Sequence, residues 1–308
     1  MNHSKKKSKK INKTRKYKKL VCNPNVHGRT IKKNSCFTSE VLYNLRDSYN
    51  LHHPTDKIMQ KDKKSIWNSF QKKMPTCSRE DCWFSTIQDQ HIKRKLFQMT
   101  FAPKQPTEWK KSPSSWLSNN DILNVLKQYE KAYANFRFIG PTPIDFDSKP
   151  VDSDSVCVWK DLCTFQLSNF VDKDIRKIGI VFNLDRHDQS GSHWTSLFID
   201  LDDKIIFYMD SIGDTIPAEI NKLVQRITRQ GLELFTPIQF VYYENHPFAH
   251  QYGNNECGMY SLYFIITMLL NKTDRRKFKT LKSKVNYFKK HRISDKYVFS
   301  YRKKYFNI

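Results

Sequence analysis

The stretch HQYGNNECGMYSLYFIITML, residues 250–269, decides how the rest of the chain is interpreted. Its apolar side chains recur every three or four positions, which is the periodicity of a helix packed against a core. The residues on this apolar face are Met259, Leu262, Tyr263, Ile266, Leu269 and Leu270. The pattern predicts a helix with Cys257 in its first turn and with Asn254 or Asn255 available as the N-cap.

A cysteine in the first turn of a helix is a candidate nucleophile. The partial positive charge at the helix N-terminus stabilises a thiolate, which is the reactive form of the side chain. Gly258 has no side chain and leaves the approach to the sulfur uncrowded. A buried structural cysteine is the alternative interpretation of Cys257, and this segment alone does not separate the two.

A nucleophilic thiol needs a base, and the base needs a group that orients it. His193 lies between a Gly-Ser turn and a predicted strand, and Asp210 ends the following predicted strand. If these strands form a hairpin, both side chains lie at the same end of neighbouring strands, within hydrogen-bonding distance. The pattern indicates an imidazole held by a carboxylate. An exposed histidine and a turn-forming aspartate are the alternative.

Gln251 lies six residues before Cys257, in the predicted loop that leads to the helix. Its side-chain amide could join the backbone N–H of Cys257 in binding the oxyanion of an acyl-transfer intermediate. Glutamines in loops are usually only solvated, so this role depends on the neighbouring candidates.

Other residues compete for these roles. His187, His250 and Cys163 are the nearest rivals of the candidate base and nucleophile. Trp194 is expected to fill the core or to wall a substrate cleft rather than to act chemically.

Four short runs rich in β-branched and aromatic residues predict strands. They are residues 178–184, 195–201, 204–209 and 237–243. Asp202 and Asp203 have the composition of a hairpin turn between two of them. Helical periodicity occupies residues 217–230, and a further amphipathic helix starts after Asn119 or Asn120, either of which could cap it.

Taken in order, a His-Trp, an Asp-Ser after a strand, a glutamine and a Cys-Gly at a helix start resemble the ubiquitin-like-protein-specific cysteine proteases. That family includes the SUMO proteases and the maturation proteases of adenoviruses, poxviruses and asfarviruses. The matching residues are His193-Trp194, Asp210-Ser211, Gln251 and Cys257-Gly258, with Trp116-Leu117 at the head of the first helix. The likeness covers about residues 114–271. Glu256 departs from the family, which usually has Asp before the nucleophile.

The resemblance implies an α+β, circularly permuted papain-like fold with a central mixed sheet flanked by helices. Cys257 would attack the scissile carbonyl, and His193 would take and return the proton. Asp210 would orient the imidazole, and Gln251 would help to hold the oxyanion. Neither a metal nor a cofactor is expected.

Charge is concentrated at the two ends of the chain. Residues 1–39 carry 13 Lys and Arg and no acid, residues 272–308 carry 14 basic and two acidic residues, and the 232 residues between them have a net charge of −1. Such ends suit a polyanion such as nucleic acid, because each cation that neutralises a phosphate releases a counterion. A solvated tail or a nuclear-import signal is the alternative.

We expect three regions along the chain. Residues 1–40 are expected to form a basic flexible tail, residues 41–112 a mainly helical accessory region, and residues 113–308 the catalytic domain with a basic C-terminal segment. Prolines punctuate the connector before the catalytic domain. They are Pro103, Pro106 and Pro113.

Composition excludes several classes of protein. No apolar run reaches the roughly 18 residues that a membrane span needs, and the start lacks the apolar stretch of a secretory signal. The odd count of seven cysteines and the missing signal lead us to expect free thiols rather than disulfides. No pair of cysteines has the tight Cys-x-x-Cys spacing of a zinc ribbon.

The function expected from these features is a cysteine endopeptidase that cleaves viral structural polyproteins or core proteins after small-residue motifs such as Gly-Gly-X. One alternative is a protease that deconjugates SUMO or another ubiquitin-like protein. The other is a nucleic-acid-binding scaffold on a degenerate protease fold. The expected location is the viral factory in the host cytoplasm and the virion, or the nucleus for a deconjugating enzyme. The sequence predicts neither the oligomeric state nor the role of residues 41–112.

Overall fold

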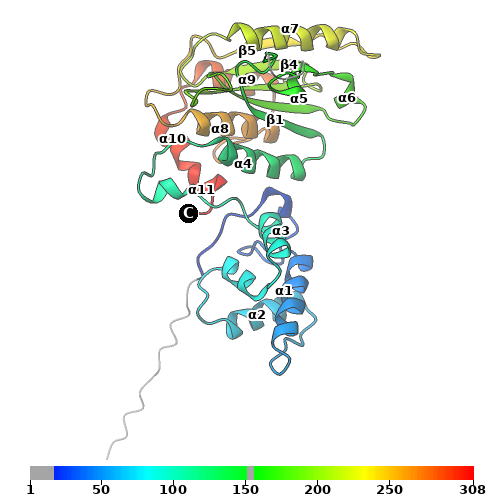
Figure 1. Ribbon diagram of the computed structural model, residues 1–308, viewed down its shortest axis with the longest axis vertical. Helices are drawn as coiled ribbons and strands as arrows, with labels where there is room; N and C mark the ends of the chain where they lie inside the picture. The colour runs from blue at the N-terminus through cyan, green and yellow to red at the C-terminus, as the bar shows by residue number, and fades with distance from the viewer. Residues whose placement is uncertain (1–16, 151–155) are drawn as a thin grey trace, which may run out of the picture. The chain divides into compact units, whose positions relative to one another are not determined.

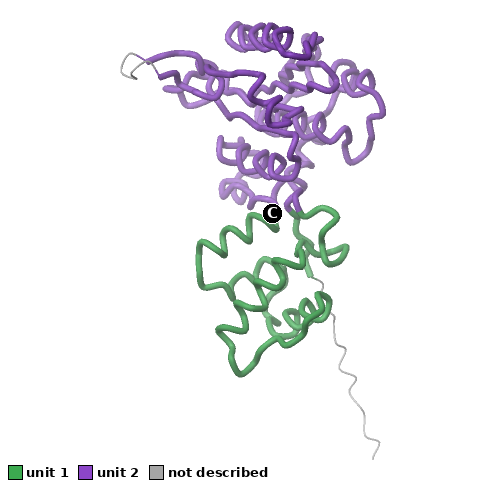
Figure 2. The backbone as a smooth tube through the Cα atoms, turned by 90° about the vertical axis from the view of Figure 1, so that its right-hand side faces the viewer, with its two compact units in different colours: residues 1–22, 26–101 green, residues 23–25, 102–308 purple. Residues whose placement is uncertain are grey.

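The computed structural model describes residues 17–150 and 156–308, which form two compact units (Figure 2). The first unit contains residues 26–101 together with the described residues up to 22. The second contains residues 102–308 together with residues 23–25. Each unit has its own hydrophobic core.

The boundaries differ from those expected from the sequence. The units divide between residues 101 and 102 rather than at 112, because Trp109 is buried in the core of the second unit. The expectation of a flexible tail up to residue 40 is wrong from residue 17 onward, since Leu20 and Phe37 are buried in the first unit. Their spacing is too irregular to give a periodic signal. The rest of the expected tail, residues 1–16, lies outside the described residues.

The first unit is built from helices around an aromatic core. Its elements are α1 (Ser39–His52), α2 (Lys63–Lys73) and α3 (Gln90–Thr100), with a short 3-10 helix at Glu80–Thr86. A second 3-10 helix, Pro24–Val26, contains residues assigned to both units. The ring of Trp83 stacks between Phe37 and Phe70, with centroids 5.4 and 5.2 Å away. Buried Glu80 accepts a hydrogen bond of 2.7 Å from the indole N–H of Trp67.

The second unit contains a five-stranded mixed sheet, which confirms the expected α+β class. Its strands are β1 (Phe136–Pro143), β2 (Lys177–Asn183), β3 (Trp194–Asp200), β4 (Ile205–Met209) and β5 (Val241–Glu244). They lie in sequence order across the sheet. The two outer pairs, β1 with β2 and β4 with β5, are parallel, and the pairs between them are antiparallel.

Helices cover both faces of this sheet (Figure 1). One face carries α5 (Lys160–Cys163), α6 (Ser168–Val171) and α7 (Ala218–Leu232). The other carries α4 (Asn119–Ala132), α8 (Cys257–Leu270) and α9 (Leu281–Lys290). Two short helices, α10 (Asp295–Ser300) and α11 (Arg302–Tyr305), complete that second layer. The helix α8 is buried along almost its whole length and packs directly against β3.

Several elements differ in detail from the prediction. The strand β1 was not predicted, because Gly140, Pro141 and Pro143 interrupt its apolar pattern. The last predicted strand begins at Val241 rather than at residue 237. The N-cap of α4 is Ser118, whose side chain accepts a hydrogen bond from the backbone N–H at position 121.

The expectation of free thiols is wrong for six of the seven cysteines. They pair as Cys22–Cys36, Cys77–Cys82 and Cys157–Cys163. The Cα atoms of the pairs lie 5.1, 5.6 and 6.5 Å apart, a proximity that the cysteine count and the missing secretory signal do not report. Cys257 is the free cysteine.

Two further properties concern the described residues. Within residues 17–150 and 156–308, no group of His, Cys, Asp and Glu side chains is arranged to hold a metal ion. In the same ranges, every helix is too short or too polar to cross a lipid bilayer.

Candidate active site

His193 and Asp210 meet at one end of the β3–β4 hairpin. The register pairs Ser196 with Met209, so the residue before β3 and the residue after β4 emerge side by side. The Nε2 atom of His193 lies 2.8 Å from Oδ1 of Asp210. The predicted hairpin and the predicted pairing of these two side chains are therefore both present in the structure.

Asp210 is fully buried and is held by a residue that sequence reasoning missed. The backbone N–H of Asp210 donates to Oδ1 of Asn245 over 2.9 Å, and Nδ2 of Asn245 donates back to the Asp210 carbonyl over 2.6 Å. A second donor, the backbone N–H of Ile212, reaches the same carboxylate oxygen as His193 over 2.9 Å. The bonds to Asn245 thus fix the backbone of Asp210, and the Ile212 N–H fixes the carboxylate oxygen that faces His193.

Cys257 is the first residue of α8, as predicted, and only 1% of it is exposed. Neither predicted asparagine caps the helix: Glu256 occupies the N-cap and makes no side-chain capping bond. Asn255 instead accepts a hydrogen bond of 3.1 Å from the indole of Trp116. The space above Gly258 is also used differently from the prediction. A Cβ atom there would lie 3.1 Å from Leu117, so this glycine allows close packing of the helix start.

The electrostatics of the site favour a charged imidazole. Burial lowers the pKa of His193, but the hydrogen bond to Asp210 and a contact with the thiol of Cys257 raise it, and the net result is a pKa well above the usual range of a histidine. Because Nε2 faces Asp210, Nδ1 is the ring nitrogen left for the sulfur. Together with the N-terminus of α8, this arrangement suits a thiolate–imidazolium pair.

Gln251 lies beside the same residues and is 5% exposed. Its backbone N–H donates to the carbonyl of Ser211 over 2.8 Å, and the Ser211 hydroxyl donates to its Oε1 over 2.8 Å. Its Nε2 donates to the carbonyl of Gly253 over 2.6 Å, which engages one of its two amide hydrogens. The side chain is therefore held in one orientation in the loop before Cys257.

The three rivals are placed in other environments. Both ring nitrogens of His250 are bonded to backbone, with Nε2 2.8 Å from the carbonyl of Phe288, and burial lowers the pKa of this histidine to about 4. His187 pairs with Asp145 at 2.7 Å. Cys163 is in a disulfide. None of the three contacts the thiol of the candidate nucleophile.

Sequence similarity to known proteins identifies the family of the region that contains the site. Residues 158–307 match the Ulp1 protease family, C-terminal catalytic domain. This part of the chain belongs to that family. The Ulp1-family domain includes the predicted histidine, aspartate, glutamine and cysteine, and extends beyond residue 271 to the C-terminal helices.

The curated relatives of the chain are viral proteases. A putative thiol protease of Acanthamoeba polyphaga mimivirus is 27% identical over 271 residues, covering 81% of this chain and 84% of the relative. A cysteine protease of African swine fever virus is 26% identical over 199 residues, covering 62% and 68%. The crystal structure of an African swine fever virus protease superposes with a TM-score of 0.61 at 18% identity, over 94% of this chain and 96% of the other. Residues 158–307 thus form a cysteine protease domain of the Ulp1 family, and the fold of the chain is shared with the solved viral enzyme.

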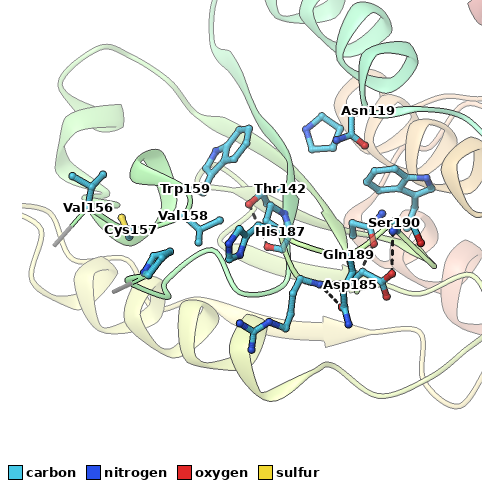
Figure 3. A pocket seen from close by; sticks show the side chains of 17 residues that line it. Asn119, Thr142, Val156, Cys157, Val158, Trp159, Asp185, His187, Gln189 and Ser190 are labelled. Atoms are coloured by element: carbon cyan, nitrogen blue, oxygen red, sulfur yellow. Dashed lines mark hydrogen bonds between the residues drawn. The ribbon is translucent and has the colours of Figure 1, made fainter. Parts of the chain in front are cut away.

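A groove made of two adjoining hollows lies at the start of β3, where Trp194 follows His193 in the sequence. A hollow of about 360 Å³ lies between Trp116 and Trp194, and a pocket of about 440 Å³ continues from it past Gly191 to His187. In Figure 3, Asn119 lies toward one end of this pocket, with the segment 156–159 toward the other. Trp194 is 4% exposed, and its indole N–H donates to the Leu117 carbonyl over 3.1 Å. It therefore packs in the core and also lines both hollows.

Proposed function

We propose that the protein is a cysteine endopeptidase in which Cys257 is the nucleophile, His193 the acid and base, and Asp210 the orienting group. The observation that supports this most directly is the contact of one imidazole with both the buried carboxylate and the free thiol at the start of α8. The fixed orientation of the imidazole and the helix N-terminus are the features that such a nucleophile requires.

The chemistry follows from these positions. The Cys257 thiolate adds to the scissile carbonyl carbon, and the carbonyl π electrons move to oxygen to give a tetrahedral oxyanion. The backbone N–H of Cys257 and the free amide hydrogen of Gln251 would donate to this oxygen. As the C–N bond breaks, the His193 imidazolium gives its proton to the leaving amine. Water then attacks the thioester, and the neutral imidazole takes one proton from it. The carboxylic acid is released, and the thiolate–imidazolium pair is regenerated.

The substrate we propose is a viral structural polyprotein or core protein, cut after a small-residue motif such as Gly-Gly-X. The hollow between Trp116 and Trp194 lies beside the helix start that carries Cys257, and two indole walls favour residues without bulky side chains before the scissile bond. The proposed location is the viral factory in the host cytoplasm and the virion, in keeping with the viral relatives.

The experiment compares purified wild type with Cys257→Ala against two reporters. One is a Gly-Gly-X peptide library, and the other is SUMO or ubiquitin with a thiol-reactive carboxyl-terminal group. Cleavage of the peptides by wild type alone supports the maturation protease. Labelling of wild type by the modifier without peptide cleavage would assign it to the deconjugating alternative and the nucleus. Cleavage by Cys257→Ala would overturn the proposed nucleophile.

We also propose that the basic N-terminal region binds nucleic acid. Residues 1–39 carry 13 cations and no acid. The basic C-terminal segment contributes less than its composition suggests, because it folds into α9–α11 and two of its cations, Lys284 and Arg302, are buried. Lys284 donates to Asp203 and Asn271, and neither cation is free to meet a phosphate.

A further inference from the structure

Arg302 is almost completely buried beside the nucleophile, although it comes from the last helix of the chain. Its side chain is 2% exposed, and that of Glu256, which precedes Cys257, is 7% exposed. The guanidinium forms a two-pronged contact with this carboxylate, with Nη2 donating over 2.9 Å and Nε over 3.2 Å. Paired planar geometry of this kind is strong because both donors are fixed together.

The same guanidinium also binds the segment that precedes α4. Its Nη1 donates to the carbonyls of Pro113 and Ser115, each over 3.0 Å. Its Cζ lies 4.1 Å from the ring centroid of Trp109, which holds the guanidinium plane from one side. Groups from residues 109–115 and from Glu256, which are far apart in the sequence, therefore converge on one arginine.

Arg302 contacts residues that are one or two positions in the sequence from residues that line the groove. Ser115 is followed by Trp116 and Leu117, and the Leu117 carbonyl accepts the indole N–H of Trp194. On the other side, Glu256 is the N-cap of the helix that begins at Cys257. The guanidinium thus joins the wall of the groove to the start of the nucleophile helix.

Charge gives the contact a second consequence. A carboxylate one residue before a thiolate repels it unless a cation neutralises the carboxylate. Burial raises the pKa of Glu256, and the charge and hydrogen bonds of Arg302 oppose that shift. A cation at this position therefore keeps the negative charge of Glu256 paired beside Cys257.

We propose that Arg302 is a positioning residue of the active site, which neutralises Glu256 next to Cys257 and anchors residues 113–115 so that Trp116 stays in place. This inference rests on the proposed function for its effect on cleavage, whereas its effect on the thiol can be measured without a substrate. It assigns a role in the site to the C-terminal segment, which the sequence suggested only as a basic end.

Two variants of Arg302 distinguish the neutralisation of Glu256 from the anchoring of residues 113–115. Arg302→Lys keeps a cation beside Glu256 but loses the planar fork that reaches residues 113–115. We expect it to raise KM for Gly-Gly-X peptides about 10-fold and to leave the pH profile of Cys257 alkylation unchanged. Arg302→Met removes the cation, and we expect the midpoint of that profile to rise by about one pH unit.

A double variant that also removes the charge of Glu256 distinguishes the electrostatic role of Arg302 from a purely structural one. Arg302→Met combined with Glu256→Gln removes the unpaired carboxylate, so the alkylation midpoint should return toward wild type. A purely structural role predicts no such return, because the double variant lacks every bond that the single variant lacks. Lys304→Met is the matched control, since Lys304 lies on the same helix and pairs with Asp274 at the surface.

Alkylation by iodoacetamide between pH 5 and 9 is measured on the full chain, with the signal of Cys257→Ala subtracted and the folded fraction checked by circular dichroism. An Arg302→Met midpoint equal to that of Lys304→Met, or a double variant shifted as far as the single one, would overturn the proposal. If wild type cleaves no peptide while the midpoints shift as expected, the proposed substrate fails and the role of Arg302 stands.

Discussion

At the scale of single residues, Asp210 controls the charge state of His193. Because its hydrogen bond and charge raise the pKa of this histidine, the imidazolium persists through neutral pH in wild type. Asp210→Asn should let the ring lose its proton at lower pH, so the thiolate–imidazolium pair exists over a narrower range. We expect kcat/KM to fall on the order of 10³-fold and alkylation of Cys257 near pH 6 to slow. Unchanged alkylation across the pH range would contradict this role.

The pKa of His250 is shifted in the opposite direction to that of His193, and this shift affects the stability of the fold. Burial lowers its pKa to about 4, so the folded state resists a proton that the unfolded chain accepts near pH 6.5. Stability is therefore complete above that pH and is lost as pH falls toward 4, by up to about 1.4 kcal/mol per unit. His250→Gln keeps a polar side chain at this position, and its melting temperature should fall less between pH 6.5 and 4 than that of wild type. Exposed His291→Gln is the control, and equal acid sensitivity in all three proteins would argue against this account.

The residues of the site were predictable to different degrees for a physical reason. His193, Asp210 and Cys257 each adjoin the end of a strand or helix whose apolar period is visible in the sequence, so local patterns located them. Asn245 and Arg302 act through contacts that span 35 and 46 positions. No local pattern reports such a distance, and an arginine in a run of lysines resembles a surface cation.

At the scale of elements, the close approach of α8 to the segment before α4 depends on Gly258. A Cβ atom there would lie 3.1 Å from Cβ of Leu117 and 3.2 Å from Cδ1 of Trp194, so both neighbours must shift by a few tenths of an ångström. Gly258→Ala should cost about 1 kcal/mol of stability and lower kcat/KM about 10-fold, because Trp194 lines the groove.

Gly253→Ala tests whether any added methyl group near the site would act similarly. A Cβ atom at Gly253 would meet only a carboxylate oxygen of Asp295, at 3.8 Å, so this variant should behave like wild type in melting temperature and peptide cleavage. Equal losses in both variants would show that the packing of Gly258 is not the cause.

Helices and strands were predictable where their apolar residues follow a single helical or strand periodicity without interruption. The strands β2, β3 and β4 and the helices α4, α7 and α8 each carry an uninterrupted apolar pattern. The strand β1 contains Gly140, Pro141 and Pro143, and its edge position tolerates them because a proline there removes no interior ladder bond. The short helices α10 and α11 have too few turns to show a periodic face.

At the scale of the whole molecule, amino-acid composition was a poor guide to the structure of the two ends of the chain. A count of lysines and arginines does not distinguish buried side chains from exposed ones. Residues 17–40 supply buried side chains to the first unit, and residues 272–308 complete the core of the second. Charge that is folded into a core cannot release counterions from nucleic acid. Burial withdraws only Lys284 and Arg302 from the 14 cations of residues 272–308, so both ends of the chain keep cations that a polyanion can reach.

This distribution predicts that the N-terminal cations contribute to nucleic-acid binding alongside those of the C-terminal segment. Removal of residues 1–16 deletes eight cations, and the slope of log K against log salt for duplex DNA should become less steep by several units, at about 0.9 for each phosphate that is no longer neutralised. Lys303→Ala and Lys304→Ala together should change the slope by less than two units. Fluorescence anisotropy between 50 and 300 mM NaCl measures both. A truncated protein with the slope of wild type would place the binding surface elsewhere, because the slope reports how many phosphates the protein neutralises, whatever its affinity.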